Sequence, residues 1–352
     1  MVGWSRPARA ASSGWLLALA LCSGCAPFGQ RSSAPSGAGA ETANGPAAAA
    51  PAEPVSPPSG LPPAPAPPPR EPVSQATPPG ALASAPPAPR HLHIALALGG
   101  GAARGFAHIG VIKALEARGI VPDIVVGTSA GSLVGALYAG GFTGTQLNRI
   151  ALSMDEAALS DWSMTARGLF KGESLQNYVN RILKDRPIEK LDRKFGATAT
   201  DLRTGQLVVF ERGNTGLAVR ASSSVPGLFQ PVTISGREYV DGGLVSPVPV
   251  RAARRLGADV VIAVDISARP ASGEPSTVLG VLLQTFAIMG QTIGGYETRE
   301  ADVVLLPTLP TMAGSDFESR NNAVLAGEEA VALNAQRIKD VIDTKRRELG
   351  TE

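Results

Sequence analysis

The chain has 352 residues, of which 32 are basic and 30 acidic, so its formal net charge is only +2. This near balance excludes an overall positive field that would draw the protein to nucleic acid or an anionic membrane. Both cysteines, Cys22 and Cys25, lie near the N-terminus, so the chain beyond them has no thiol for a disulfide, a thiolate metal site or a cysteine nucleophile. We expect three segments: a signal over 1–25, a linker over 26–90 and one globular domain over 91–352.

Residues 1–25 have the pattern of an export signal. Arg6 and Arg9 give a positive start, and the apolar run that follows them is too short to span a bilayer stably. The segment ends in Leu21-Cys22-Ser23-Gly24-Cys25, which resembles the signal of bacterial lipoproteins, where the chain is cleaved before a cysteine that becomes acylated. We therefore expect lipidation at Cys25, with an ordinary signal peptide as the alternative. Because Ala26 is not an inner-membrane retention Asp, the resemblance implies an exported outer-membrane lipoprotein that faces the periplasm or the surface.

Residues 26–90 consist almost entirely of Ala, Pro, Ser and Gly and include 19 of the 30 prolines. Such a composition has too few apolar side chains to form a core, which predicts a disordered or polyproline-like linker. At about 3.1 Å per residue, this linker would separate an anchor from a working domain by at most roughly 200 Å.

The domain begins with two strand–helix units. The apolar run over 94–98 predicts a strand within 91–98, and a glycine-rich loop over 99–105 leads from it into a helix that ends near 118. A second strand over 124–126 turns into a helix that ends at 139. This alternation is typical of a parallel sheet, so we predict an α/β fold with a parallel-rich central sheet and helices on both faces.

The later elements follow from the same patterns and complete the α/β expectation. In chain order they are a mostly helical region over 145–190, a hairpin with strands at 197–200 and 207–210, a glycine-punctuated stretch that ends at 243, a helix at 250–256, strands at 260–264 and 303–306, and one closing helix at 322–348.

The motif Gly127-Thr128-Ser129-Ala130-Gly131 carries the sharpest chemical signal. It has the form G-x-S-x-G and lies between a predicted strand and a predicted helix, where a sharp turn exposes the serine hydroxyl and requires small neighbours. The start of the helix also favours developing negative charge, through its free N–H groups and its dipole. A glycine-rich turn with an incidental serine is the plain alternative, but the context favours Ser129 as a nucleophile.

A nucleophilic serine needs a base, and the histidine positions limit the choice. The three histidines, His91, His93 and His108, all precede Ser129, which excludes the chain order Ser, acid, His of α/β-hydrolases. His108 lies on the first helix, and packing is its plainer role. The remaining candidate is the carboxylate Asp241, followed by two glycines that let the backbone pass close to another segment, although Asp-Gly-Gly by itself is usually a turn.

The glycine loop after the first strand allows two interpretations. A dinucleotide fingerprint fits poorly, because Arg104 occupies the place of a glycine or alanine and no acid ends the second strand. An oxyanion hole fits better, with the N–H groups of Gly100 and Gly101 directed at an ester carbonyl oxygen as it becomes negative. The residues that we expect around this hole are Gly99, Gly100, Gly101, Arg104, Gly105 and Ala130.

These motifs together resemble the patatin-like phospholipase family. The resemblance rests on Gly99 to Gly105, on Gly127-x-Ser129-x-Gly131 and on Asp241-Gly242-Gly243, in that order, and it extends from about residue 94 to 266. It implies a Ser–Asp dyad with Ser129 as nucleophile and Asp241 as proton acceptor, acting on acyl esters of lipids or phospholipids without a metal or other cofactor. No nucleic-acid partner is expected from the balanced charge, and no nucleotide from the mismatches in the glycine loop. Membrane attachment through an N-terminal acyl anchor is expected from the signal alone.

Two apolar segments and two other functions remain open. A helix over 278–289 is apolar around most of its circumference, a pattern more often buried against a sheet than in contact with lipid. The segment 159–170 fits either a lid over an acyl pocket or ordinary packing. The alternative functions are a tethered lipid-binding protein without turnover, and a carboxylesterase or thioesterase for soluble esters.

Overall fold

The structure is a computed structural model, and it describes residues 91–154, 162–165, 168–267, 275–309, 312 and 316–350. The expected signal over 1–25, with Cys25, and the expected linker over 26–90 lie outside these residues. So does much of the expected lid segment, of which 159–161 and 166–167 are not described.

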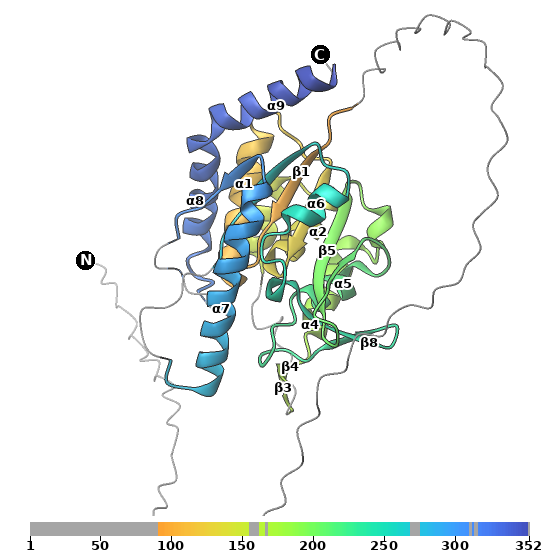
Figure 1. Cartoon of the computed structure of the whole chain (residues 1–352). Helices are drawn as coiled ribbons and strands as arrows, with labels where there is room; N and C mark the ends of the chain where they lie inside the picture. The colour runs from red at the N-terminus through yellow and green to blue at the C-terminus, as the bar shows by residue number, and fades with distance from the viewer. Residues whose placement is uncertain are drawn as a thin grey trace, which may run out of the picture. The chain divides into compact units, whose positions relative to one another are not determined.

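A mixed sheet forms the centre of the described domain, in the order β10-β9-β1-β2-β5-β8-β7, with β6 paired to β5 (Figure 1). The first five strands in this order are parallel to one another, whereas β6 and β8 run antiparallel to β5, and β7 antiparallel to β8. The strands are β1 (Ile94–Leu98), β2 (Ile124–Thr128), β5 (Lys194–Asp201), β6 (Leu207–Phe210), β7 (Val232–Ile234), β8 (Arg237–Asp241), β9 (Val260–Val264) and β10 (Val303–Leu305). A separate hairpin pairs β3 (Trp162–Thr165) with β4 (Gly168–Phe170).

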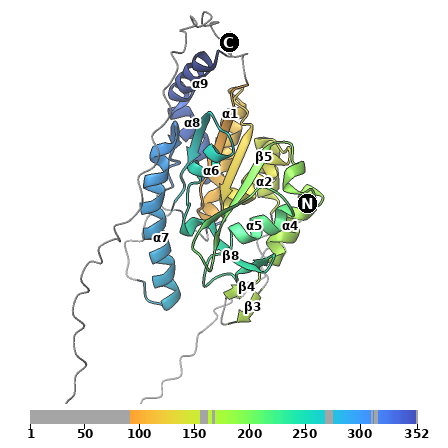
Figure 2. The same ribbon diagram turned by 45° about the vertical axis from the view of Figure 1, so that its right-hand side comes forward.

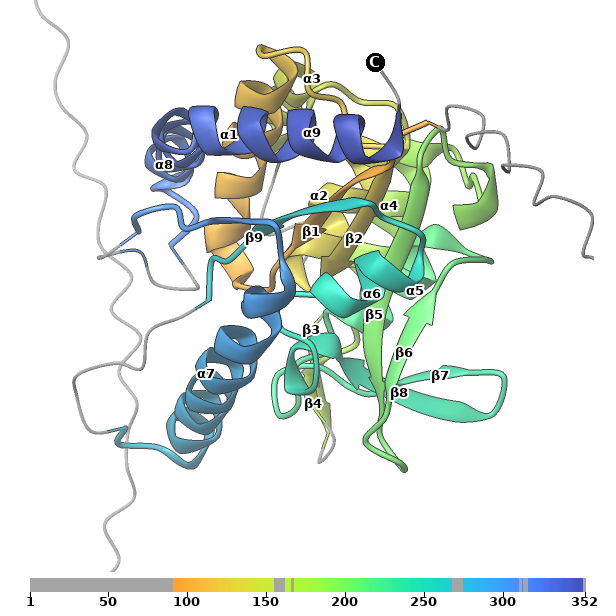
Figure 3. The ribbon, with the colours of Figure 1, turned by 45° about the horizontal axis from the view of Figure 1, so that its top comes forward.

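Helices cover both faces of the sheet, as the sequence predicts (Figure 3). Side chains of β1 point alternately to the two faces of the sheet. Ile94, Leu96 and Leu98 pack among α1, α2 and the C-terminal helices, whereas Ala95 and Ala97 pack against α6. The helices are α1 (Phe106–Glu116), α2 (Ala130–Ala139), α3 (Gly144–Leu152), α4 (Glu173–Leu183), α5 (Thr215–Ser222), α6 (Val250–Arg255), α7 (Val278–Glu297), α8 (Arg320–Leu333) and α9 (Ala335–Leu349).

Most predicted strands agree with the structure, but two helical predictions need correction. The region 145–190 contains the expected helices, but it is divided, because the β3–β4 hairpin stands between α3 and α4. The closing helix is two helices that meet at Asn334, whose ψ of 6° is outside the helical range and whose side chain donates to the carbonyl of Ala330 at 2.9 Å. Helix α5 begins at an Asn214 cap that accepts the N–H of Leu217 and was not predicted.

Helix α7 also departs from expectation, because it is not buried against the sheet. Of its 20 residues, the buried ones are Gly290, Gly294 and Glu297, all in its C-terminal half. Its N-terminal half extends beyond the sheet, at the end of the domain that also carries the β3–β4 hairpin (Figure 2). By length and composition, the segment Val278–Glu300 within the described chain is long and apolar enough to cross a membrane.

Candidate active site

Ser129 occupies a strained turn between β2 and α2. Its φ of 53° and ψ of −122° lie outside the regions that residues with a side chain normally adopt, which is a common mark of a functional turn. Two close contacts explain the flanking glycines. A Cβ at Gly127 would lie 2.3 Å from the carbonyl oxygen of Gly131, and one at Gly131 would lie 2.2 Å from that of Leu98. The turn therefore excludes any larger residue at either position, as the motif predicts.

A serine of α5 fixes this turn from the opposite side. The backbone N–H of Ser129 donates to Oγ of the buried Ser222 at 2.9 Å, and the carbonyl of Ser129 accepts the hydroxyl of Ser132 at 2.7 Å. No local sequence pattern marks Ser222 as part of the site, because it contacts a turn that lies 93 residues away in the chain.

Asp241 reaches Ser129 because of the sheet register. It ends β8, which runs antiparallel to β5 and places Asp241 opposite Ala199, while the neighbouring Thr198 pairs with Thr128 at the end of β2. The backbone of Asp241 is held on both sides, since its carbonyl accepts the hydroxyl of Thr200 at 2.8 Å and its N–H donates to the carbonyl of Ser224 at 2.9 Å. One central strand thus positions both predicted catalytic residues.

The carboxyl group of Asp241 is buried, with 1% of the residue exposed. Burial raises its pKa to about 6, while the N–H of Gly243 and the hydroxyl of Ser129 oppose that rise by stabilising the charge. Oδ1 accepts the Gly243 N–H at 2.7 Å, whereas Oδ2 is buried without a hydrogen bond of good geometry to any described residue. Oδ2 is therefore the oxygen free to accept a proton. In an unliganded site such a catalytic hydrogen bond is often loose.

The glycine loop only partly matches the predicted oxyanion hole. The N–H of Gly99 donates to the carbonyl of Val264, and that of Gly100 donates to the carbonyl of Pro247, both at 3.0 Å. The expectation that Gly100 offers a free donor is therefore wrong for this conformation, because a residue from a distant loop takes its N–H. Among the described residues, the backbone N–H groups of Gly101 and Ala130 have no such acceptor, and both residues are partly exposed. Ala130 directly follows Ser129, and Gly101 follows Gly100, where an added Cβ would lie 3.3 Å from the Ser129 Cβ.

Arg104 and Gly105 place the loop against the nucleophile. A Cβ at Gly105 would lie 2.8 Å from the Cβ of Ala130, so only glycine lets the turn Ala102–Gly105 approach the start of α2 so closely. The Arg104 side chain is half-buried, and this desolvation lowers its pKa although Asp265 partly offsets the effect. Its Nε is buried with no described partner. The glycine loop thus carries a guanidinium group whose Nε has no described partner.

His108 packs inside the domain, as the plainer interpretation expected. The ring is fully buried, and Nε2 lies 2.8 Å from the carbonyl oxygen of Gly99, so Nε2 must carry the hydrogen. Burial lowers its pKa to about 4, which keeps the ring neutral at ordinary pH. His108 supports the glycine loop through its bond to Gly99 and makes no hydrogen bond to Ser129.

A narrow apolar cavity of about 70 Å³ opens beside the nucleophile. Gly105 and Ala130, the residue that follows Ser129, are among its lining residues, and other lining residues come from α1, α2, α3 and α4. The other lining side chains are almost all aliphatic or aromatic, including Leu133, Met154 and Phe317. The cavity therefore suits an alkyl group that is attached to a carbonyl held at Ser129.

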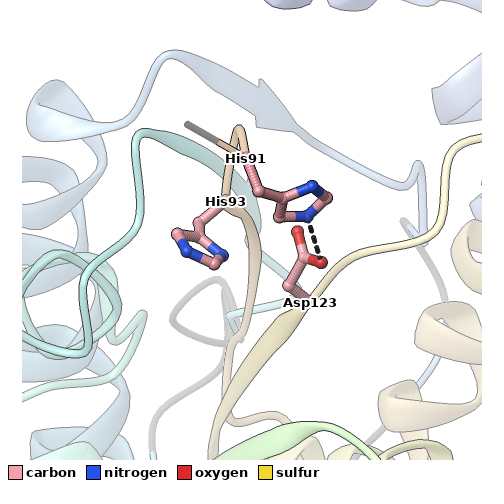
Figure 4. A group of neighbouring side chains, drawn as sticks. All are labelled: His91, His93 and Asp123. Carbon is pink, nitrogen blue, oxygen red and sulfur yellow. Dashed lines mark hydrogen bonds and ion pairs between the residues drawn. The ribbon is translucent and has the colours of Figure 1, made fainter. Parts of the chain in front are cut away.

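A larger cavity of about 640 Å³ lies at the opposite ends of the strands, next to α9. At its edge, His91, His93 and Asp123 form a group whose ligand atoms all lie within 4.8 Å, and Nε2 of His91 is 2.8 Å from Oδ1 of Asp123 (Figure 4). This donor set suits a divalent transition metal. His91 and His93 lie just before β1 and Asp123 just before β2, whereas Ser129 follows β2. Because β1 and β2 are parallel, the group lies at the opposite ends of these strands and takes no part in the chemistry at Ser129.

Glu297 is a further buried acid near the site that the sequence did not suggest. Its carboxyl group accepts the Ser246 hydroxyl at 2.6 Å and the Val248 N–H at 3.1 Å. Burial raises its pKa to about 7, against the effect of these two bonds. The same short loop contains Pro247, whose carbonyl holds Gly100, so the end of α7 is connected to the glycine loop through one tripeptide.

Fold and site together define the class: a mixed α/β domain in which a strained serine at a strand-to-helix turn lies beside a buried carboxylate. Residues 96–254 match the family model described as patatin-like phospholipase. Over this stretch the chain is therefore similar to patatin-like phospholipases.

Sequence comparisons agree over this part of the chain. It is 38% identical over 177 residues to an uncharacterized NTE family protein of Mycobacterium tuberculosis, across 49% of each chain. It is 35% identical over 184 residues to patatin-like phospholipase domain-containing protein 6 of Mus musculus, across 50% of this chain and 14% of that one. The chain thus matches about half or less of these relatives' length.

Two solved structures show a weaker likeness. VipD from Legionella pneumophila aligns with a TM-score of 0.49 and 14% identity, over 73% of this chain and 68% of that one. ExoU of Pseudomonas aeruginosa, in its complex with SpcU, aligns with a TM-score of 0.40 and 17% identity, over 73% of this chain and 52% of that one.

Proposed function

We propose that the protein is a serine acyl hydrolase that cleaves fatty-acyl esters of lipids, with Ser129 as nucleophile and Asp241 as base. The observation that carries the proposal is the strained Ser129 beside a buried carboxyl oxygen that makes no hydrogen bond of good geometry to the described residues, next to a narrow apolar cavity. The family match supports a phospholipid as the substrate class.

In the first step, Oγ of Ser129 attacks the ester carbonyl carbon while Oδ2 of Asp241 takes the hydroxyl proton. The carbonyl oxygen becomes negative, and the N–H groups of Gly101 and Ala130 are the donors placed to stabilise it. Collapse of this intermediate breaks the bond to the alcohol oxygen, and the proton on Asp241 passes to the leaving alcohol. An acyl group then remains on Ser129.

In the second step, Asp241 takes a proton from a water molecule that attacks the acyl carbon. Collapse releases the fatty acid and returns the proton to Oγ of Ser129, which restores the starting state. Burial of Asp241 serves both steps, because the raised pKa makes the carboxylate a stronger base than an exposed aspartate.

The two catalytic steps predict activity that depends on Ser129. The test uses the full chain and its Ser129→Ala variant, each with a long-chain phospholipid and with a short p-nitrophenyl ester. We expect fatty acid release from the phospholipid by the wild type only. Activity confined to the short ester would favour a general esterase or thioesterase, and binding of phospholipid without turnover of either ester would favour a lipid-binding protein.

We also propose that the mature protein is an exported outer-membrane lipoprotein, acylated at Cys25. The cysteine at the end of an apolar leader and the 65-residue linker rich in proline support this assignment. A Cys25→Ser variant tests it, and Cys22→Ser is its matched control. Metabolic labelling of the protein with a fatty acid is expected to be lost for Cys25→Ser alone. Labelling that persists in Cys25→Ser would overturn the proposal.

A further inference from the structure

We propose that the outward face of α7 binds the surface of a lipid bilayer and holds the opening of the Ser129 site against it. This inference rests on the proposed function for its meaning, because a lipid ester must leave a bilayer to reach Ser129. The physical argument, however, depends on α7 itself and is tested separately below.

The composition of α7 is unusual for an exposed helix. No charged residue occurs between Val278 and Tyr296, a stretch of 19 residues, although the helix is open to solvent over most of its surface. Exposed fractions reach 90% at Val278 and 59% at Tyr296. The other large exposed apolar side chains on α7 are Val281, Leu282, Ile288 and Met289. A continuous exposed patch of this kind marks a binding surface for an apolar partner.

The inner side of α7 forms part of the boundary of the active site. The ring of Phe286 lies 3.1 Å from the position of a Cβ on Gly243, the residue that holds Oδ1 of Asp241. Leu282 and Leu279 stand 2.8 and 3.3 Å from the same position on Gly227, in the loop that follows α5. A surface bound to the outer side of α7 would therefore be one helix diameter from the dyad.

The connections of α7 favour a helix that lies in the membrane interface over one that crosses the bilayer. The segment that contains α7 connects β9 to β10, and these strands are parallel neighbours. Both ends of this segment are therefore attached to the same sheet. A helix that crossed the bilayer would require the segment before it, whose sequence includes the charged residues Asp265, Arg269 and Glu274, to cross as well. Charged side chains resist transfer into hydrocarbon. The Glu297 contacts also fix the C-terminal end of α7 to the domain.

Size and end groups favour a bilayer over a second copy of the chain. One side of a 20-residue helix, about 30 Å long and about 10 Å wide, offers only a few hundred Å², which is below the roughly 800 Å² per partner of a stable protein interface. Interfacial helices of this size do bind bilayers. At the C-terminal end, the guanidinium of Arg299 lies 5.1 Å from the ring centre of Tyr296, and this pair of residue types is typical of the headgroup level.

The chain offers a local probe, because both native cysteines lie in the leader. In the full chain with Cys22→Ser, Cys25→Ser and Ser129→Ala, a single Ile288→Cys carries an environment-sensitive fluorophore. Leu333→Cys, a 78% exposed position at the end of α8, is the matched control. The probe is neutral phosphatidylcholine vesicles, with and without lipids that carry a quencher in the acyl chain.

We expect vesicles to shift the emission at position 288 to the blue and to allow quenching there, with no change at position 333. Because α7 carries no charge on this face, the shift should persist in high salt. No shift at 288, or equal shifts at both positions, would overturn the inference. A shift at 288 that appears without vesicles and grows with protein concentration would overturn it in favour of a second copy.

Paired substitutions test the consequence for turnover. Val281→Asp with Ile288→Asp should lower the ratio of vesicle hydrolysis to soluble-ester hydrolysis at least about tenfold, because charges resist transfer into the interface. Leu333→Asp is the control. An unchanged ratio would contradict docking through α7. Vesicle binding through α7 without any Ser129-dependent hydrolysis would instead contradict the proposed function and leave the docking surface standing.

Discussion

Gly243 donates its backbone N–H to Oδ1 of Asp241 at 2.7 Å, and this bond makes the two carboxylate oxygens different from each other. Oδ1 is fixed, so the carboxyl group cannot rotate freely, and Oδ2 remains buried without a described hydrogen-bond partner. The geometry is that of a base whose accepting oxygen is oriented before substrate arrives.

The dyad predicts that Asp241→Asn is nearly as damaging as Ser129→Ala. An asparagine keeps the bond to Gly243 through its oxygen but cannot accept a proton, so we expect kcat to fall at least about 10³-fold while the fold persists. Ester hydrolysis and circular dichroism on the same preparations check this. His108→Gln is the control, and if that variant lost activity to the same extent while folded, the assignment of Asp241 as the base would be wrong.

The pKa of Asp241 predicts how activity depends on pH. The carboxyl group must be ionised to accept the Ser129 proton, and burial places its pKa near 6. Activity on a soluble ester should therefore rise tenfold per pH unit below about 6 and reach a plateau above it. A rate profile measured from pH 4 to 9 checks this. A rise centred near pH 4 would show that the carboxyl group titrates as an exposed aspartate does.

Burial of Asp241 should also reduce stability at high pH. The folded pKa is above the ordinary 3.8, so the folded state holds a proton that the unfolded chain releases, and the stability linked to this proton is lost as the pH rises through about 6. Asp241→Asn should therefore raise the free energy of unfolding at pH 8, by at most about 3 kcal/mol, and change it little at pH 4. Thermal unfolding of both proteins at the two pH values measures this difference, and a variant equally or less stable at pH 8 would contradict it.

The turn at Ser129 predicts a sharp difference between two glycine substitutions. Gly127→Ala places a Cβ 2.3 Å from a backbone oxygen, which forces the turn to move. We expect loss of several kcal/mol of stability together with loss of activity. Gly295→Ala, on the exposed side of α7, meets no atom within 4 Å and should be neutral or slightly stabilising. Thermal unfolding and ester hydrolysis distinguish the two, and an active, stable Gly127→Ala protein would mean that the turn has another geometry.

Glu297 predicts an effect on catalysis without contact with substrate. Removing its carboxyl group in Glu297→Ala frees Ser246 and Val248, and the loop between them then holds Gly100 less firmly. Gly101, the proposed oxyanion donor next to Gly100, then loses part of its orientation. We expect kcat to fall about tenfold with KM for a soluble ester little changed, since one such donor contributes a factor of about 10² to 10³. Glu297→Gln should recover most of the loss. If KM rose instead and kcat stayed constant, Glu297 would have a different role.

The sequence by itself determined the local parts of this protein. Apolar runs of three to five residues predicted β1, β2 and β9, because strands buried on both faces consist mainly of apolar residues. The G-x-S-x-G spacing predicted the turn at Ser129, because only small residues fit where two backbones nearly touch. The absence of a histidine after Ser129 pointed to a carboxylate, and Asp-Gly-Gly supplied the candidate.

The tertiary structure decided whatever depends on residues far apart in the chain. The register of β5 brings Asp241 beside Ser129, Pro247 takes the N–H of Gly100, and Ser222 holds the turn from 93 residues away. No local pattern encodes such contacts, because they arise from strand order and packing. The exposure of α7 is of the same kind. An apolar helix has the same sequence pattern whether it packs against a sheet or is exposed. Only the tertiary structure shows that most of α7 is exposed.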